Sequence, residues 1–448
     1  MLKWHRERSS RLLSVMACLI VVLAGLSACT QGSSSSSNTF AEPSNPITIG
    51  VSISNKKDAA GDDFVSDGAA TLQGYQLWQD TINSNGGLLG RPVKLDVLYD
   101  DSDPDVVAAN YTKLITKDRV NLVFGPFSSF LNKLGAGPVA AQYGYALVEG
   151  SGGAPSVFAK GWSNIFDVSL PVANNLITFA YYILSLPPDQ RPKKAAYLTS
   201  DDLFTFPQVE LARTLLEKAG VKTVYPIGDK TSMPPDNSPL LNKLPAGYEQ
   251  FNEGDTKTAA ADAALVAHSG ADVAILGTLL PDVKVEVAEF KKDNYNPKAI
   301  IATAGPDDGQ DFVNAVGGSH YTEGVFVPNG WYLTSNTYQN SAMVSSYLNK
   351  YGGTVDQINA DVAEAFSVGQ VVQQAAEKIN SIDNAKLIQE LHSTDVFNTV
   401  QGTVQFDSTG QNVQAIAYLF QWQGGQYIPV YPYSNAAENP EYPRPANF

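Results

Sequence analysis

Residues 120–129 read Val-Asn-Leu-Val-Phe-Gly-Pro-Phe-Ser-Ser, an apolar run followed by a glycine-proline turn and two hydroxyls. A near-continuous apolar run such as Val120 to Phe124 is typical of a parallel strand that is covered on both faces. A helix beginning just after Ser128 and Ser129 would point unpaired backbone N–H groups at the turn. Those groups can bind an anion such as a carboxylate, although either serine can equally be a helix cap. The turn is therefore a candidate binding site.

The residues before this stretch predict alternating strands and helices. Ile47 to Ile53 and Val93 to Tyr99 alternate as strands, and between them apolar residues recur at helical spacing, which assigns Trp78 to the core. Asp103 is expected to cap the next helix with Pro104 in its first position, and a metal site in this acidic cluster is the less favoured alternative. This order predicts an open parallel sheet whose ligands lie beyond the carboxyl ends of the strands.

A second set of such units begins near residue 193. Strands are expected at 195–199, 221–227, 272–276 and 298–302, a helix at 208–219 and a long loop at 228–257. We therefore predict an α/β fold class with two doubly wound parallel-sheet lobes.

Composition narrows the classes of function. The chain has 448 residues, of which 44% are hydrophobic, so it can bury large cores in two or three domains. It carries 30 Lys and Arg against 45 Asp and Glu, a net charge of −15. Because phosphate neutralisation needs a basic face, we expect no nucleic acid partner.

The first residues predict export. A basic start is followed by an apolar run of about fifteen residues, which describes a signal peptide over 1–28. The sequence Leu-Ser-Ala-Cys that ends at Cys29 resembles a bacterial lipobox, which implies cleavage before Cys29 and lipidation of its thiol; a plain secreted protein is the alternative. The second cysteine, Cys18, lies inside the signal, so the mature chain is expected to have neither a disulfide nor a cysteine metal site. The polar residues 29–46 are expected to form a flexible tether.

Several motifs together resemble the type I periplasmic binding proteins of the branched-chain amino-acid (Leu/Ile/Val-binding) family, in a lipoprotein form. They are Ile-Thr-Ile-Gly-Val at 47–51, Asn-Gly-Gly-Leu-Leu-Gly-Arg-Pro-Val at 85–93, Asp-Asp-Ser-Asp-Pro at 100–104 and Gly-Pro-Phe-Ser-Ser at 125–129. The resemblance continues more weakly to about residue 430.

The resemblance implies two lobes, joined by three crossovers, that close on a small solute and deliver it to an ABC permease. Lobe 1 would comprise 47–168 and 331–398, lobe 2 would comprise 169–330 and 399–430, and 431–448 would be a C-terminal tail. The protein would be held by lipid on the outer face of the bacterial cytoplasmic membrane, or be periplasmic. The solute would be an amino acid or another small carboxylate.

The family's binding residues carry over to specific positions. The serine that holds a ligand carboxylate matches Ser129, with Ser128 beside it, and the next contact loop places Ser151 and Gly152 at the ligand. An acidic residue that pairs with a ligand ammonium matches Asp307, for which a helix cap is the alternative. The covering aromatic matches Phe204, or Phe206 if the alignment slips. Leu280 stands in the region that carries the family's tyrosine and would make an apolar wall.

The sequence does not indicate an enzyme, a metal site or a cofactor. Outside the signal, none of the histidines has metal-ligand spacing to a second one, and no Gly-x-Ser-x-Gly elbow or Walker loop occurs. The main alternative to transport is a ligand-sensing subunit, which would need a separate membrane receptor.

Overall fold

A computed structural model describes residues 45–59, 63–200, 202–226 and 254–445. The predicted signal peptide, Cys29 and nearly all of the predicted tether lie outside these residues. Among the described helices, none combines the length and the apolar character needed to cross a bilayer.

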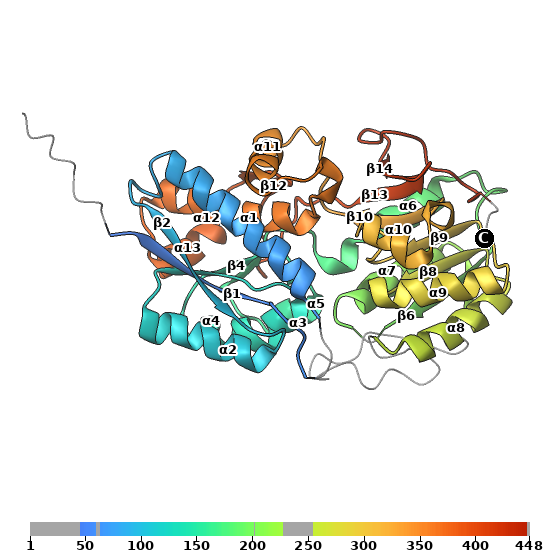
Figure 1. The fold of residues 1–448 in the computed structure, drawn as a ribbon, viewed down its shortest axis with the longest axis horizontal. Coiled ribbons are helices and arrows are strands. Elements are labelled where there is room, and N and C mark those ends of the chain that lie inside the picture. The colour runs from blue at the N-terminus through green and yellow to red at the C-terminus, as the bar shows by residue number, and fades with distance from the viewer. Residues whose placement is uncertain (1–44, 60–62, 201, 227–253, 446–448) are drawn as a thin grey trace, which may run out of the picture. The chain divides into compact units, whose positions relative to one another are not determined.

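The first sheet is parallel throughout and has the strand order β2-β1-β3-β4-β5 (Figure 1). Its elements are β1 (Ile47–Ile53), α1 (Val65–Ser84), β2 (Val93–Tyr99), α2 (Pro104–Lys113), a π-helical turn (Leu114–Asp118), β3 (Leu122–Phe124), α3 (Ser129–Leu131), a second π-helical turn (Asn132–Ala136), α4 (Gly137–Tyr143), β4 (Leu147–Glu149), α5 (Pro155–Phe158) and β5 (Ile165–Asp167). The predicted strands and the helix containing Trp78 are confirmed. Asp103 caps α2 by accepting from two backbone N–H groups, as predicted, with Pro104 at its start.

The second sheet has the order β14-β13-β10-β9-β8-β6-β7. Its elements are a 3-10 turn (Val172–Asn174), α6 (Ile177–Ser185), β6 (Lys194–Thr199), α7 (Thr205–Lys218), β7 (Lys222–Tyr225), α8 (Thr256–His268), β8 (Val273–Gly277), α9 (Leu280–Lys292), β9 (Ala299–Ala302), α10 (Gln310–Val316), a 3-10 turn (Ser319–Tyr321), β10 (Val325–Asn329), β13 (Tyr418–Gln423) and β14 (Gln426–Tyr431). One edge of this sheet departs from the predicted parallel arrangement, because β13 is antiparallel to both β10 and β14. They form a hairpin around Gly424 and Gly425, both of positive φ, which is a turn signal that the prediction did not use.

The segment between β10 and β13 returns to the first sheet. It contains α11 (Asn340–Tyr351), a 3-10 turn (Val355–Gln357), α12 (Ala360–Ile379), α13 (Asn384–Leu391) and the short hairpin of β11 (Phe397–Thr399) and β12 (Gly402–Val404). Side chains from these elements share one apolar core with β1 and α1. In the described residues the chain thus passes between the sheets after β5, after β10 and after β12, in agreement with the predicted three crossovers. The domain bounds themselves stay a prediction.

Helix α12 lies unusually close to α1, and Figure 1 shows the two helices on the same side of the first sheet. Trp78 is 1% exposed, as the helical spacing predicts. Its ring lies where a side chain at Gly369 would be, since a Cβ there would come within 2.2 Å of Trp78 Cδ2. Glycine therefore allows the ring to pack directly on the α12 backbone, which fixes the position of the α12 residues near the strand ends.

The chain after β14 is bound along the second sheet as far as it is described. The backbone N–H of Arg444 donates to the carbonyl oxygen of Lys298 (2.7 Å), and its Nε donates to that of Glu323 (2.9 Å). Tyr442 packs against the core of this sheet. The sequence alone leaves this tail either on the surface or disordered, and the structure docks residues 431–445 through these contacts.

Candidate functional site

Two carboxyl groups end neighbouring strands of the first sheet. Glu149 and Asp167 are the last residues of β4 and β5, are paired in register, and have fully buried side chains. Glu149 Oε2 accepts hydrogen bonds from the backbone N–H groups of Ser151 (2.8 Å) and Gly152. Asp167 Oδ1 accepts from the N–H of Ser169 (2.8 Å). The other oxygen of each carboxyl has no hydrogen-bond partner, which is costly in a buried group.

Helix α12 adds two more carboxyl groups at its first turns. Asn359 caps this helix by accepting from the N–H of Asp361 (2.9 Å). Glu364 follows three residues later and therefore lies on the same helix face as Asp361. The hydroxyl of Ser151 donates to Glu364 Oε2 (3.1 Å), which ties the loop after β4 to α12. Glu149, Asp167, Asp361 and Glu364 are called the carboxyl cluster below.

Burial disfavours the ionised forms of the cluster. It raises the pKa of Asp167 to about 7 and that of Glu364 to about 8, where repulsion from the charge of Asp167 adds to the effect. The pKa of Glu149 also lies well above its ordinary value through burial and then the charge of Asp167, although its two N–H donors act in the opposite direction. Burial therefore favours the protonated forms of these groups, whereas a cation bound nearby would favour their ionised forms.

Two further carboxyl groups interact electrostatically with the cluster. Asp67, in the first turn of α1, has its pKa raised to about 6, chiefly by burial. Asp307, between β9 and α10, has a pKa of about 6 for the same reason, with the charge of Asp67 as an additional cause. The charges of both residues raise the pKa of Asp361, after the larger effect of burial. Negative groups from both sheets therefore act on one region.

The arrangement suits hydrogen-bond donors better than a bare metal ion. In the described ranges, no three His, Cys, Asp or Glu side chains converge closely enough to hold a metal ion. None of the ion pairs between described residues includes a member of the carboxyl cluster, Asp67 or Asp307. Oxygen acceptors spread along two strand ends and a helix can instead receive several N–H groups of one molecule.

The structure places the predicted serines at the turn after β3. Ser128 is the N-cap of α3 and its hydroxyl accepts from the N–H of Leu131 (3.1 Å). Its φ of 75° is a strained value for a residue with a side chain, and such strain often marks functional turns. Ser129 is 3% exposed, and its hydroxyl accepts from the N–H of Ala154 (3.1 Å). Ser129 thus joins this turn to the loop of Ser151 and Gly152.

Ser151 and Gly152 lie beside Glu149, so the structure brings them into the carboxyl cluster. A Cβ at Gly152 would lie 2.6 Å from Asn132 Nδ2 and 2.7 Å from Glu149 Oε1. Only glycine leaves room for this buried carboxyl group. The family resemblance places this loop at the ligand, but the backbone N–H groups of Ser151 and Gly152 are occupied by Glu149 itself.

The predicted residues of the second lobe differ in exposure. Phe204 precedes α7 and is half-buried, whereas Phe206 is fully buried in an apolar cluster that also contains residues of the first sheet. Leu280 begins α9 and packs partly against the core of the second sheet. Asp307 does not cap α10, whose N-cap is Gly309, and its Oδ1 is buried without a hydrogen-bond partner. The role of each as a ligand contact stays a prediction.

Sequence reasoning missed all four members of the carboxyl cluster. Glu149 stands directly before the loop that carries Ser151, and a buried acidic residue at the end of an apolar strand was the available signal. Asp167 has the same signal. Nothing local marks Asp361 or Glu364, because their relation to β4 exists only after α12 folds onto the first sheet.

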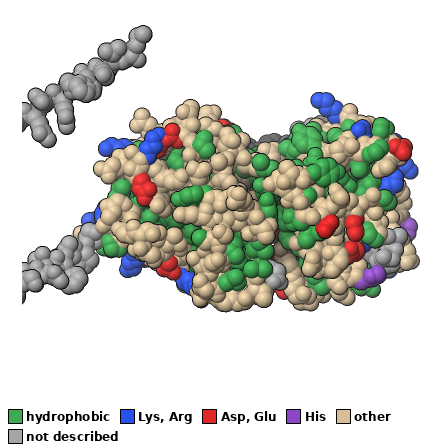
Figure 2. All heavy atoms as spheres, turned by 90° about the horizontal axis from the view of Figure 1, so that it is seen from above, with side chains coloured by type: hydrophobic (Ala, Val, Ile, Leu, Met, Phe, Trp, Pro, Cys, Tyr) green, Lys and Arg blue, Asp and Glu red, His purple; other side chains and the backbone are tan. Residues whose placement is uncertain are grey.

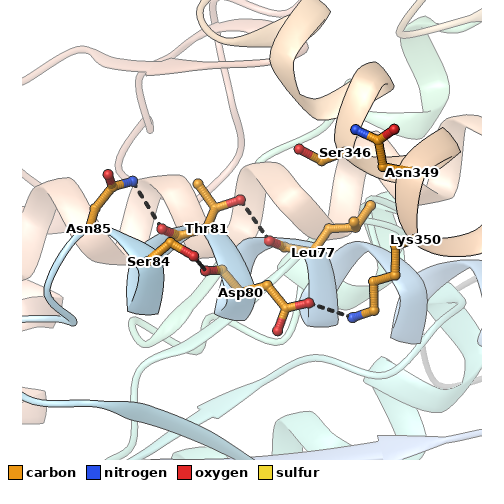
Figure 3. Close-up of a pocket in the computed structure, with 8 residues that line it drawn as sticks. All are labelled: Leu77, Asp80, Thr81, Ser84, Asn85, Ser346, Asn349 and Lys350. Atoms are coloured by element: carbon orange, nitrogen blue, oxygen red, sulfur yellow. Dashed lines mark hydrogen bonds and ion pairs between the residues drawn. The ribbon is translucent and has the colours of Figure 1, made fainter.

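A hollow of about 550 Å³ lies elsewhere, between α1 and α11 (Figure 3). Its acidic and basic groups are already paired, since Lys350 Nζ contacts Asp80 Oδ2 at 2.7 Å. The hydroxyls of Thr81 and Ser84 donate to backbone carbonyls of their own helix. Because these polar groups are satisfied internally, the hollow lacks the signature of the carboxyl cluster. The eight residues that line it are Leu77, Asp80, Thr81, Ser84, Asn85, Ser346, Asn349 and Lys350.

Two α/β lobes with polar groups gathered beyond the strand ends define the architecture of a bilobed solute-binding protein. The model of the periplasmic binding protein family matches residues 46–426, and the chain belongs to this family. Its members are extracytoplasmic solute-binding proteins and not enzymes. The predicted family and fold class are thereby confirmed. Figure 2 shows one face of the molecule with acidic and basic side chains scattered among uncharged ones.

Relatives resemble the chain in sequence, and solved structures share its fold. The chain is 24% identical over 376 residues to Leu/Ile/Val-binding protein homolog 7 of Brucella melitensis, which covers 82% of this chain and 87% of that protein. It is 25% identical over 272 residues to an amino acid binding protein of Pseudomonas aeruginosa, covering 59% and 64%. The substrate-binding protein LivJ of Streptococcus pneumoniae in complex with isoleucine has a TM-score of 0.67 at 19% identity and covers 85% and 97%. A putative branched-chain amino acid ABC transporter protein from Silicibacter pomeroyi has a TM-score of 0.70 at 17% identity, covering 90% and 100%.

Proposed function

We propose that this protein captures a small polar solute between its two lobes and delivers it to an ABC permease. The supporting observation is the group of buried, incompletely bonded carboxyl groups beyond β4 and β5. Open α/β sheets bind ligands in that position, and a ligand would supply the missing hydrogen bonds. The relatives named above are binding proteins for amino acids or components of amino-acid transporters, which agrees with a transport role.

Lipid attachment at Cys29 belongs to the same proposal. It would hold the protein at the outer face of the cytoplasmic membrane, near its permease. The Cys29→Ser variant should be released from the membrane fraction while its folded part stays intact. Cys18→Ser is the matched control, because residue 18 lies in the segment that cleavage would remove. Equal membrane retention of both variants would contradict lipidation at Cys29.

A thermal-shift screen of the purified protein tests solute capture. A ligand present at 100 times its Kd adds about 2.7 kcal/mol to the free energy of unfolding, which is readily seen as a higher Tm. The screen should include amino acids, short and aromatic carboxylates, amides and polyamines. Stabilisation by one class supports capture, and its dependence on Glu364 would locate it. A protein that none of these classes stabilises would contradict the proposed function.

A further inference from the structure

The backbone N–H groups of Ser151 and Gly152 are neighbours in the loop that follows β4. Two adjacent N–H groups in such a loop form a natural anion site. Here both donate to Glu149 Oε2. Glu149 is fully buried and lies against the backbone of Gly152, since a Cβ there would come within 2.7 Å of its carboxyl carbon. A carboxyl group of the protein itself therefore occupies the position that a ligand carboxylate would need.

The charged groups that act on the carboxyl groups at this loop are acidic. The charges that shift the pKa of Glu149 or Glu364 come from acidic groups: Asp167 on β5 acts on both, Glu364 acts on Glu149, and Asp307 before α10 acts on Glu364. Asp361 on α12 is acted on by Asp67, Glu364, Asp307 and Asp308. Burial and then the charges of Glu149 and Glu364 raise the pKa of Tyr75 on α1, and burial, with smaller effects that include the charge of Glu149, raises that of Tyr111 on α2. Adding a ligand carboxylate here would increase repulsion, whereas a cation would relieve it.

Several buried oxygen acceptors beside this loop lack a hydrogen-bond donor. Glu149 Oε1, Asp167 Oδ2 and Asn132 Oδ1 belong to completely buried side chains and have no hydrogen-bond partner. Glu149 Oε1 and Asp167 Oδ2 face the backbone of the loop, because a Cβ at Gly152 or Gly153 would lie 2.7 or 2.3 Å from them. These three acceptors lack hydrogen-bond donors. This observation does not depend on how many acidic residues lie nearby.

We propose that the solute is an organic cation without a carboxylate, held at the carboxyl cluster, and that Glu149 excludes carboxylates by occupying the N–H groups of Ser151 and Gly152. Diamines and polyamines have the required chemistry, with several N–H donors and no anion. This inference rests on the proposed function and names the class of solute. It replaces the expectation of an amino acid or another small carboxylate.

Calorimetric titration separates this inference from the proposed function. The cation probes are putrescine, spermidine and agmatine; the carboxylate probes are leucine, glutamate and isovalerate. At pH 7 a cation probe should bind, and titrations in buffers of different ionisation enthalpy should show proton release, because a cation lowers the raised pKa values of Asp167 and Glu364. Binding of leucine in place of the cations would overturn the inference and leave solute capture standing. Failure of all three cations would also overturn it.

Variants test the two roles separately. Glu364→Gln should weaken binding of the cation probe at least about tenfold. Glu149→Ala empties the N–H pair, so leucine or isovalerate should gain at least about tenfold in affinity over wild type. Glu438→Ala, at an exposed carboxyl group, is the control and should change neither.

Unchanged carboxylate binding by a folded Glu149→Ala protein would overturn the blocking role. If that variant does not fold, the sign of proton exchange in wild type still decides the class of solute. Tighter binding of Mg²⁺ or Ca²⁺ than of any amine would also overturn the proposal.

Discussion

Ser151 Oγ donates a hydrogen bond to Glu364 Oε2 over 3.1 Å, although the two residues are 213 positions apart in the chain. The bond joins the loop at the end of β4 to the first turns of α12. It also couples the loop that contains Glu149 to a carboxyl group with a pKa of about 8, which burial and the charge of Asp167 raise. The position of α12 and the charge at the strand ends therefore depend on each other.

Removing this hydroxyl should affect both stability and titration. In Ser151→Ala, Glu364 loses a donor that favours its ionised form, so its pKa should rise further. The free energy of unfolding above that pKa should fall by about 1 kcal/mol. Chemical denaturation and infrared titration of the carboxyl groups measure the two effects. Ser156→Ala is the control, since its buried hydroxyl has no hydrogen-bond partner and its loss should cost little.

Stability without ligand should decrease from about pH 4 to pH 7. Burial raises the pKa of Asp167 from 3.8 to about 7, so the unfolded chain loses this proton first as the pH rises. Its stabilising contribution is complete below pH 4 and lost by about pH 7, at about 1.4 kcal/mol per unit of pKa shift at most. Denaturation of wild type and Asp167→Asn across this range checks the effect, with Glu438→Gln as control. A wild-type profile as flat as that of Asp167→Asn would contradict the role of Asp167.

Packing of α12 on α1 should be intolerant of a single methyl group. Gly369→Ala would place a Cβ within 2.2 Å of the Trp78 ring, and such overpacking costs about 1–3 kcal/mol. Because α12 carries Asp361 and Glu364, ligand affinity should fall with stability. Glu377→Ala, on an exposed position of the same helix, is the matched control. The double variant Gly369→Ala/Trp78→Leu should recover part of the loss, and strict additivity of the two changes would argue against direct contact.

The end of the chain should contribute to stability of the second lobe. Removing residues 441–448 deletes the two hydrogen bonds of Arg444 to the carbonyl oxygens of Lys298 and Glu323. It also deletes the two hydrogen bonds between Glu441 and Gln421 and the one from the Tyr442 hydroxyl to the carbonyl oxygen of Gln190. At about 1 kcal/mol for each lost bond, the midpoint of thermal unfolding should fall by several degrees. Glu438→Ala is the control. An unchanged midpoint in the truncated protein would show that these contacts do not stabilise the folded state.

The sequence was sufficient for the local elements of the fold. The strand of Ile47 to Ile53, the core position of Trp78 and the capping of α2 by Asp103 follow from periodicity and from side chains that act on their own neighbours. Such signals are contained within one turn or one strand. The antiparallel hairpin of β13 and β14 was missed although its Gly-Gly turn is also local, because that stretch was assigned from family likeness and not from its turn chemistry.

The candidate site was less predictable because its chemistry is created by tertiary packing. The resemblance assigns Ser151 and Gly152 to a contact loop, but the occupation of their N–H groups by Glu149 depends on where one carboxyl group turns. Glu364 approaches that loop only because Gly369 lets α12 lie against α1. No spacing in the sequence relates residue 149 to residue 364. Identical residue types can therefore form an anion site or block one.

Glu149 competes with any dissolved carboxylate for the backbone N–H groups of Ser151 and Gly152, and it is covalently part of the same chain. It lies two and three residues from the N–H groups it binds, so its effective concentration there exceeds the millimolar values of short flexible linkers. A dissolved carboxylate has to displace the carboxyl group of Glu149 before it can accept a hydrogen bond from either N–H group. Under the proposed blocking role of Glu149, selectivity against dilute carboxylates arises from the connectivity of the chain.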